Sequence, residues 1–315
     1  MKIPSQPLIK SFMASSIVAL FLYSCSAPTK EAESSTDAAQ ETAEKVRVSF
    51  DFEPPKPIDG VLKGVIILGS SGFDAFTVSI DTSRNWELIE ARYGVSQVYE
   101  NEASESAIKE GLQAYIESIV ENGVSGSNIY FLVSSSAKEN EKVKQIKAGL
   151  EQLGYVVTEV SAEEEATYGY YATVPEAYRD KAFALDIGSG NSKISWLSGE
   201  ELRTISTYGS KYHLDSVDDK TVYEEFVQVA LDIPEANIDY AFIIGGAPFK
   251  LAKEVRVDKE RYTVLGTPES YTSIEDQKTK NGLNIYNAIR FSTKCEIFVF
   301  DWNSNFAIGY LLRPE

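Results

Sequence analysis

One order of strands and helices occurs twice in this chain, and the repeat constrains its fold more than any single motif does. The first copy begins with the apolar run GVIILG, Gly64 to Gly69, which turns at SSG. Two further strands are expected at 73–80 and 86–93, where apolar residues lie between turn residues. Apolar residues at helical spacing then predict two helices, which flank a strand at 129–133.

The second copy begins with AFALDIG, Ala182 to Gly188, turns at SGN and continues into two more expected strands. A helix around 222–231, a further strand and a last helix complete the unit. Self-similarity of this kind is a signal about the whole fold. We therefore predict an α/β protein with two duplicated subdomains that flank a cleft, the first at 60–179 and the second at 180–315.

Residues 1–59 precede this repeat and contain a targeting signal. A short apolar stretch at 17–22 ends in the run LYSC at Cys25. The stretch is too short to span a bilayer as a helix. LYSC resembles the lipobox of bacterial lipoproteins, which implies a signal peptide at 1–24 and lipid chains, palmitate among them, on Cys25. The alternatives are an uncleaved signal or a cysteine there by chance.

Residues 25–59 are predicted to be the lipidated cysteine and a flexible tether. The segment up to Lys45 contains no aromatic or large aliphatic side chain and cannot bury enough surface to fold. Alternating apolar residues at 46–52 then indicate a short strand before three prolines. Ser26 resembles the residue that permits export to the outer membrane. We therefore expect a lipid-anchored protein of the cell envelope, in the outer membrane and facing the periplasm or the exterior.

Composition argues against several kinds of site. The chain has 30 Lys and Arg against 47 Asp and Glu, a net charge of −17, which disfavours nucleic acid as a partner. One His and two Cys cannot supply the ligands of a usual zinc site. Mg²⁺ remains possible, because it takes carboxylates and water. If Cys25 is lipidated, Cys295 is the remaining thiol, and its apolar surroundings predict a buried, inert strand position.

The tandem repeat resembles the actin, sugar-kinase and Hsp70 superfamily, whose ribonuclease H-like subdomains face each other across a cleft. In such proteins a glycine hairpin from each half can close its N–H groups on phosphate. The resemblance implies that the phosphate-binding residues are Gly69, Ser70, Ser71, Gly188, Ser189, Gly190, Asn191 and Lys193. Gly245 and Gly246 resemble the third glycine turn, on the nucleoside side. The alternative is that these are ordinary hairpin turns.

Four motifs in order narrow the resemblance to the exopolyphosphatase and guanosine-pentaphosphate phosphatase (Ppx/GppA) family. VSAEEEA at 160–166 is similar to the family's I-S-G-x-E-E-A, and ALDIGSGNSKI is similar to its D-I-G-G-G-S-T-E-L hairpin. LVSSSA and ILGSSGF resemble two further motifs. The resemblance implies hydrolysis of a terminal phosphoanhydride, with Glu164 as general base and Asp186 holding Mg²⁺ through water.

Five positions depart from the family pattern, two of them at glycines that Ala162 and Ser189 replace. Ile67 stands where the family has an Asp beside the metal, and Glu139 stands where an Arg grips phosphate. Lys193 replaces the Glu that closes the second hairpin; it either adds positive charge on the phosphate side or is a solvated lysine on an exposed strand face. Loss of one catalytic carboxylate commonly costs a factor of about 100 to 10,000 in rate.

These features together predict a pseudoenzyme, a degenerate Ppx/GppA-like lipoprotein without a cofactor that binds a ligand or partner through the cleft. A small molecule containing phosphate is the expected ligand, and the sequence names no protein partner. Two alternatives stay open: an active Mg²⁺-dependent phosphohydrolase that cleaves polyphosphate or nucleotide, and a purely structural envelope lipoprotein. In the last case Glu164 marks only a helix start and Asp186 only a turn.

Overall fold

The computed structural model describes residues 48–69, 72–94 and 105–313, all within one compact unit that spans residues 47–315. The signal peptide, Cys25, most of the tether and the hairpin residues Ser70 and Ser71 lie outside the described residues. Within the described part, no helix combines the length and apolar character needed to cross a membrane.

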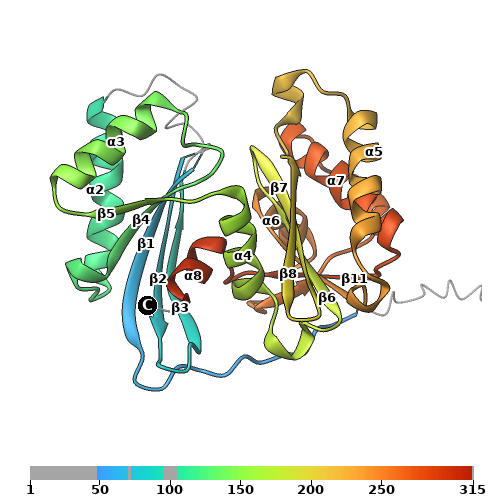
Figure 1. Ribbon diagram of the computed structural model, residues 1–315, viewed down its shortest axis with the longest axis horizontal. Helices are drawn as coiled ribbons and strands as arrows, with labels where there is room; N and C mark the ends of the chain where they lie inside the picture. The colour runs from blue at the N-terminus through green and yellow to red at the C-terminus, as the bar shows by residue number, and fades with distance from the viewer. Residues whose placement is uncertain (1–47, 70–71, 95–104, 314–315) are drawn as a thin grey trace, which may run out of the picture. The chain divides into compact units, whose positions relative to one another are not determined.

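The first sheet has five strands in the order β3-β2-β1-β4-β5. β1, β2 and β3 form an antiparallel meander, and β4 and β5 extend the sheet in parallel from β1. The helices α2 and α3 cover one face of it (Figure 1). The elements are β1 (Val61–Gly69), β2 (Gly72–Ile80), β3 (Trp86–Tyr93), α2 (Glu105–Glu121), β4 (Ile129–Val133), α3 (Glu141–Gln152) and β5 (Val156–Glu159).

The second sheet repeats this plan with one strand more, in the order β10-β11-β9-β6-β7-β8. β6, β7 and β8 form the meander, and β9 and β11 run parallel to β6. The elements are β6 (Ala182–Ile187), β7 (Asn191–Ser198), β8 (Glu201–Tyr208), α5 (Asp219–Val229), β9 (Tyr240–Ile244), α6 (Gly246–Val255), β10 (Tyr262–Val264), α7 (Gln277–Thr293) and β11 (Ile297–Asp301). The predicted α/β duplication is confirmed.

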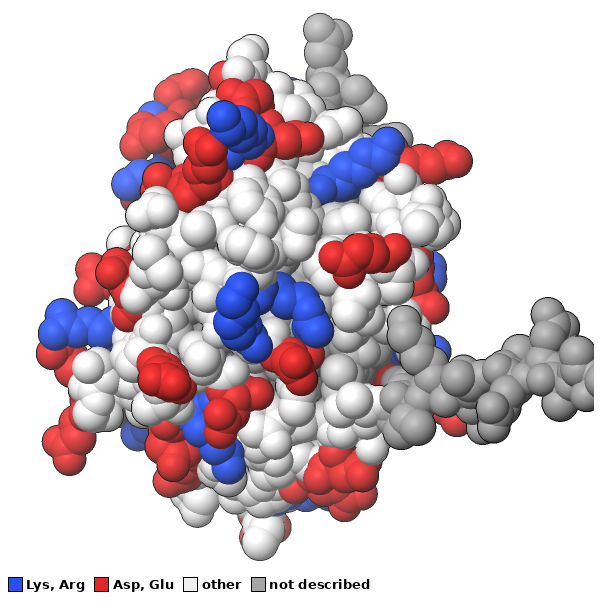
Figure 2. All heavy atoms as spheres, turned by 90° about the vertical axis from the view of Figure 1, so that its right-hand side faces the viewer, with Lys and Arg blue, Asp and Glu red and all other residues white. Residues whose placement is uncertain are grey.

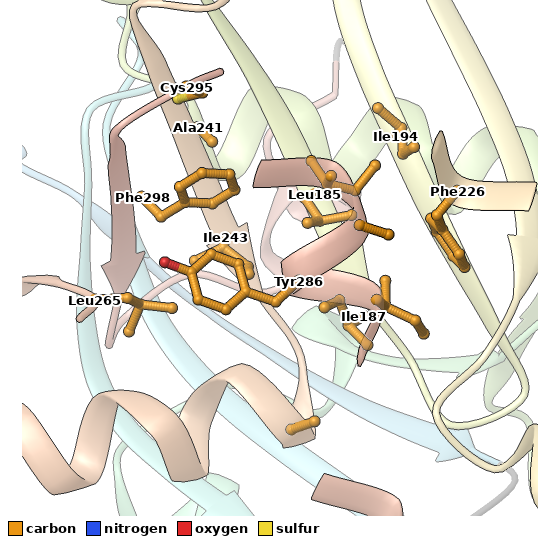
Figure 3. Close-up of a cluster of buried hydrophobic side chains, with 14 of the residues drawn as sticks. Leu185, Ile187, Ile194, Phe226, Ala241, Ile243, Leu265, Tyr286, Cys295 and Phe298 are labelled. Carbon is orange, nitrogen blue, oxygen red and sulfur yellow. The ribbon is translucent and has the colours of Figure 1, made fainter. Parts of the chain in front are cut away.

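The larger hydrophobic core lies between the second sheet and its outer helices. Figure 3 shows Leu185 and Phe298, from the strands, beside Tyr286 of α7. The Tyr286 hydroxyl donates to the Gly266 carbonyl over 2.8 Å, so the ring is buried without an unpaired polar atom. Cys295 lies two residues before β11 rather than in a strand; it is buried, and burial raises the pKa of its thiol to about 12. An unreactive thiol follows.

The helix α4 (Ala162–Thr173) packs against the inner face of the second sheet. The last helix, α8 (Phe306–Leu311), packs on α4 and on β1 and β2 of the first sheet (Figure 1). We expected residues 180–315 to belong to the second subdomain, and α8 is the exception. All six of its residues are buried, because a helix that is apolar on every side must be covered on every side.

Packing begins earlier than the expected start at Gly60. Residues 48–57 contain no strand, although an alternating pattern suggested one at 46–52. Instead the ring of Phe50 lies 5.0 Å from that of Tyr178 and 5.4 Å from that of Phe242, and Phe52 lies 5.7 Å from Tyr178. The two aromatic side chains thus bury apolar area against the second sheet, which a flexible tether would leave exposed.

Gly309 sets the distance between α8 and α4, because a Cβ at that position would lie 1.9 Å from the Tyr168 carbonyl oxygen. We predict that Gly309→Ala lowers the free energy of unfolding by about 1–3 kcal/mol through overpacking. Gly149→Ala is the matched control: it lies in α3, nothing lies within 4 Å of its Cβ, and helix propensity predicts a gain of about 0.5–1 kcal/mol. Urea unfolding of both variants measures the difference. Equal stabilities would show that α8 is not held tightly.

Candidate functional site

A pocket of about 370 Å³ collects residues that are far apart in the sequence. Turns from both hairpins and the third glycine turn all reach it, as the resemblance implied. The predicted site residues that line it are Gly69, Asp186, Gly188, Ser189, Asn191, Lys193, Gly245 and Gly246. Gly190 is not among the lining residues. The structure therefore places the glycine turns around one cavity.

Glu164, the predicted general base, does not line this pocket. Its side chain is exposed, and its carboxylate accepts a hydrogen bond from the Ser161 backbone N–H over 2.8 Å, while the Ser161 hydroxyl accepts one from the Glu164 N–H. This reciprocal pair is a capping box at the start of α4. The prediction for Glu164 is wrong, because the helix start uses that carboxylate.

Glu165 is the carboxylate that faces the pocket, since the next residue of a helix is turned by about 100°. Its side chain is 1% exposed. One carboxylate oxygen accepts from the Ser135 backbone N–H over 2.6 Å, and the other accepts from the Ser135 hydroxyl over 2.9 Å. Asn191 donates in turn to the Ser135 hydroxyl over 3.2 Å, so the second hairpin contacts the loop after β4.

Lys193 lies between two carboxylates. Its Nζ is 2.6 Å from Oε2 of Glu165 and 3.6 Å from Oδ2 of Asp186. The side chain is buried, so the alternative of a solvated lysine on an exposed strand face is wrong. The register of the hairpin explains the contact, because Asp186 of β6 pairs directly with Lys193 of β7.

The charges of this cluster are unequal. Burial disfavours the ammonium of Lys193, but Asp186 and Glu165 together outweigh this effect and raise its pKa above the usual value. The ammonium is therefore charged at neutral pH. Burial raises the pKa of Asp186, and the charge of Glu165 adds to the rise while Lys193 opposes it. The single ammonium of Lys193 thus interacts with both carboxylates. Because its pKa is raised, Asp186 loses its proton less readily than an ordinary aspartate.

The first hairpin carries its own acid, which sequence reasoning missed. Ile67 of β1 is buried and packs in the apolar cluster that includes α8. Its cross-strand partner is Asp74 of β2. The Asp74 carboxylate lines the pocket and accepts from the Gly94 backbone N–H over 2.9 Å. Burial raises the pKa of Asp74, partly offset by that bond and by the charge of Lys278.

Glu139 does not reach the pocket, although it stands where the family has a phosphate-gripping Arg. It is exposed, and its carboxylate lies 3.3 Å from Nζ of Lys144. Two lysines do line the pocket besides Lys193: Lys250, whose Nζ is 3.0 Å from Asp276, and Lys278. Three lysines therefore line the pocket, although Glu139 stands where the family has an Arg.

Gly245 forms the third turn at a position that only glycine tolerates. Its φ is +113°, and a Cβ there would lie 2.3 Å from the carbonyl oxygen of Ile187 at the end of β6. The turn opens directly into α6. The N–H groups of this helix start have no partners within the helix, and such ends favour anions. The turn thus adds a second kind of anion donor to the pocket.

Mg²⁺ does not fit between Glu165 and Asp186 in this arrangement. A magnesium ion takes oxygen ligands at about 2.0–2.1 Å and repels a neighbouring ammonium. Here Nζ of Lys193 already contacts Glu165 at 2.6 Å and lies in the space that the two acids share. Among the described residues, no group of three or more His, Cys, Asp or Glu side chains is placed to hold a metal ion.

No protein-family model matches the chain, and no curated protein sequence matches it. Solved structures do. The Aquifex aeolicus member of the Ppx/GppA family is 18% identical with a TM-score of 0.59, and the match covers 80% of this chain and 96% of that chain. An exopolyphosphatase from Cytophaga hutchinsonii is 14% identical with a TM-score of 0.63, covering 79% and 96%. At such identities the likeness concerns the fold alone. The chain has the two-domain, actin-like α/β fold of these Ppx/GppA structures.

Proposed function

We propose that the protein is a cell-envelope lipoprotein, anchored in the outer membrane through lipid on Cys25, whose cleft binds a phosphate-containing small molecule without hydrolysing it. One observation carries the proposal: the ammonium of Lys193 lies between Glu165 and Asp186, in the same pocket as three glycine turns. In this proposal the ammonium of Lys193 supplies the positive charge that a bound metal ion would otherwise bring to the cleft.

The pocket supplies donors for phosphate oxygens, and four carboxylates also line it: Asp74, Glu165, Asp186 and Asp301. Lys250 and Lys278 add positive charge at its wall, and the start of α6 adds backbone N–H groups. Asp301 also lines the pocket, but Arg261 neutralises it through two contacts of 3.1 Å. On the face that Figure 2 shows, acidic and basic side chains are interspersed, which supports a small ligand rather than a nucleic acid.

Hydrolysis would need a carboxylate that is free to take a proton from water. Both oxygens of Glu165 already accept hydrogen bonds, and one of them also contacts Lys193. The Asp186 carboxylate is buried and lies 3.6 Å from the same ammonium. The best-placed acids therefore stabilise the lysine rather than activate water.

One observation favours the alternative of an active phosphohydrolase. Asp74 lines the pocket directly across from Ile67, one strand away from where the family has its acid. In that case phosphate release from polyphosphate or nucleotide should depend on Mg²⁺ and should be abolished by Asp74→Asn.

Thermal denaturation of the full-length chain tests the proposed ligand. We predict that phosphate, polyphosphate, ADP or ATP raises the melting temperature in EDTA as much as in Mg²⁺, because mass action stabilises the bound form. Lys278→Ala and Lys250→Ala should reduce the shift, and Lys144→Ala, an exposed lysine outside the pocket, should not. A shift that requires Mg²⁺ favours the enzyme, and no shift with any of the four compounds favours a structural role.

Removing the ammonium should destabilise the protein in a pH-dependent way. We predict that Lys193→Met costs about 3–5 kcal/mol of unfolding free energy at pH 7, because two buried acids lose their cation. Burial raises the pKa of Asp186, so its contribution to stability is present below pH 3.8 and is lost as the pH rises through the folded-state pKa. The deficit should therefore shrink when urea unfolding is repeated near pH 4.5. A deficit equal at both pH values would contradict the charge argument, and Lys144→Met should change stability by under about 1 kcal/mol.

Restoring an acid at position 193 should create affinity for a metal. We predict that Lys193→Glu is unstable in EDTA and is stabilised by millimolar Mg²⁺, because three clustered carboxylates then share the cation. Wild type and Lys193→Met should show no comparable rise in melting temperature. A rise of similar size in wild type would mean that Mg²⁺ binds despite the ammonium.

A further inference from the structure

A second and larger pocket, of about 810 Å³, shares no lining residue with the cleft. Its walls come from five segments: residues 52–55, the turn between β2 and β3, the second half of α4 with the residues that follow it, Arg261 and Tyr262 at the start of β10, and the end of α8. A volume of this size accommodates a drug-sized molecule. Neither the fold nor the proposed phosphate ligand accounts for this pocket.

Four arginines line this pocket, against one acid. The arginines are Arg84, Arg179, Arg261 and Arg313, and the acid is Glu176. This concentration is unexpected in a chain with 47 acidic and 30 basic residues. A local excess of guanidinium groups attracts anions, and each group presents a planar fork that matches a carboxylate or a phosphate.

Only one of these arginines is neutralised within the described part of the chain. Arg261 makes two contacts of 3.1 Å with Asp301. Arg179 donates to the carbonyl of Val174 over 3.3 Å and lies 5.0 Å from the ring centre of Tyr171. For Arg84 and Arg179 no carboxylate lies within 4.0 Å among the described residues. The guanidinium groups of Arg84 and Arg179 are thus available at the pocket, and that of Arg313 donates to the Tyr310 carbonyl over 2.6 Å.

Arg84 is held in place by a turn that costs backbone energy. Its φ is +64°, a left-handed conformation that is unfavourable for a side chain other than glycine. The carboxylate of Asp81 fixes the turn by accepting bonds from Ser83, Asn85 and Ile58. Backbone strain that the surroundings enforce often accompanies function. Position 84 therefore carries an arginine in a backbone conformation that would cost glycine less energy.

Aromatic rings complete the walls. Trp86, Tyr168, Tyr171 and Tyr262 all line the pocket, and the guanidinium of Arg261 lies 4.7 Å from the ring centre of Trp86. Flat apolar faces beside guanidinium groups suit a ligand with two parts, an anionic group and a planar body. We propose that this pocket binds a small organic anion, a carboxylate or phosphate ester on an aromatic or apolar body. The site is independent of the phosphate ligand proposed for the cleft.

Matched probes test the charge requirement on the full-length chain. The probes are 1-naphthoate, 1-naphthyl phosphate and neutral 1-naphthol, compared by isothermal titration calorimetry. We expect both anions to bind at least about tenfold more tightly than naphthol, because charge-assisted hydrogen bonds are the strong ones. Tighter binding of the phosphate ester assigns the site to phosphate esters, and tighter binding of naphthoate assigns it to carboxylates. Naphthol binding as tightly as either anion would overturn the proposal.

Arg84→Gly is the most informative variant, because glycine relieves the left-handed strain while it removes the guanidinium. We expect its melting temperature to equal or exceed that of wild type and its affinity for the anions to fall about tenfold, with a further fall when Arg179→Ala is added. Arg203→Ala removes an exposed arginine paired with Glu201 and should change nothing. Lys250→Ala, a change in the cleft, should leave naphthoate binding intact, which separates this site from the cleft. Unchanged affinity in the Arg84→Gly, Arg179→Ala double variant would refute the site.

Discussion

The ion pair between Lys193 and Glu165 is the interaction on which the arrangement of the cleft depends. It joins the second hairpin to the start of α4, and Ser135 joins the same carboxylate to the loop after β4. Three elements from both halves of the duplication therefore meet at one carboxylate. A buried ion pair of this kind is retained only where its geometry and hydrogen bonds offset the loss of water. In this protein the contacts to Ser135 and Asp186 provide that support.

The same ion pair shows that the fold alone does not determine which charged groups lie in the cleft. The chain has the fold of the Ppx/GppA structures, and its glycine turns lie around one pocket in which the ammonium of Lys193 contacts Glu165 and Asp186. A fold carries no activity by itself, because activity depends on the groups placed in it.

Much of the fold could be predicted from the sequence, because β1 and β6 are mostly apolar strands that end at glycine turns. The positions of single side chains could not. Ser161 and Glu164 have the spacing of a capping box, a local signal that Glu165 rather than Glu164 is free to face inward. Asp74 and Lys193 needed the hairpin registers, which place them across from Ile67 and Asp186. The six residues of α8 are too few to show a periodicity that indicates which sheet they cover.

The return of α8 to the first sheet also affects how the chain is assembled. β1 and β2 are made early, but the residues that cover their inner face are 306–311. That face therefore stays open to water while the second sheet is synthesised, and the first half cannot complete its packing alone. The two halves repeat one pattern, but they do not fold independently. The first sheet can complete its packing only after α8, at the end of the second half, has been synthesised.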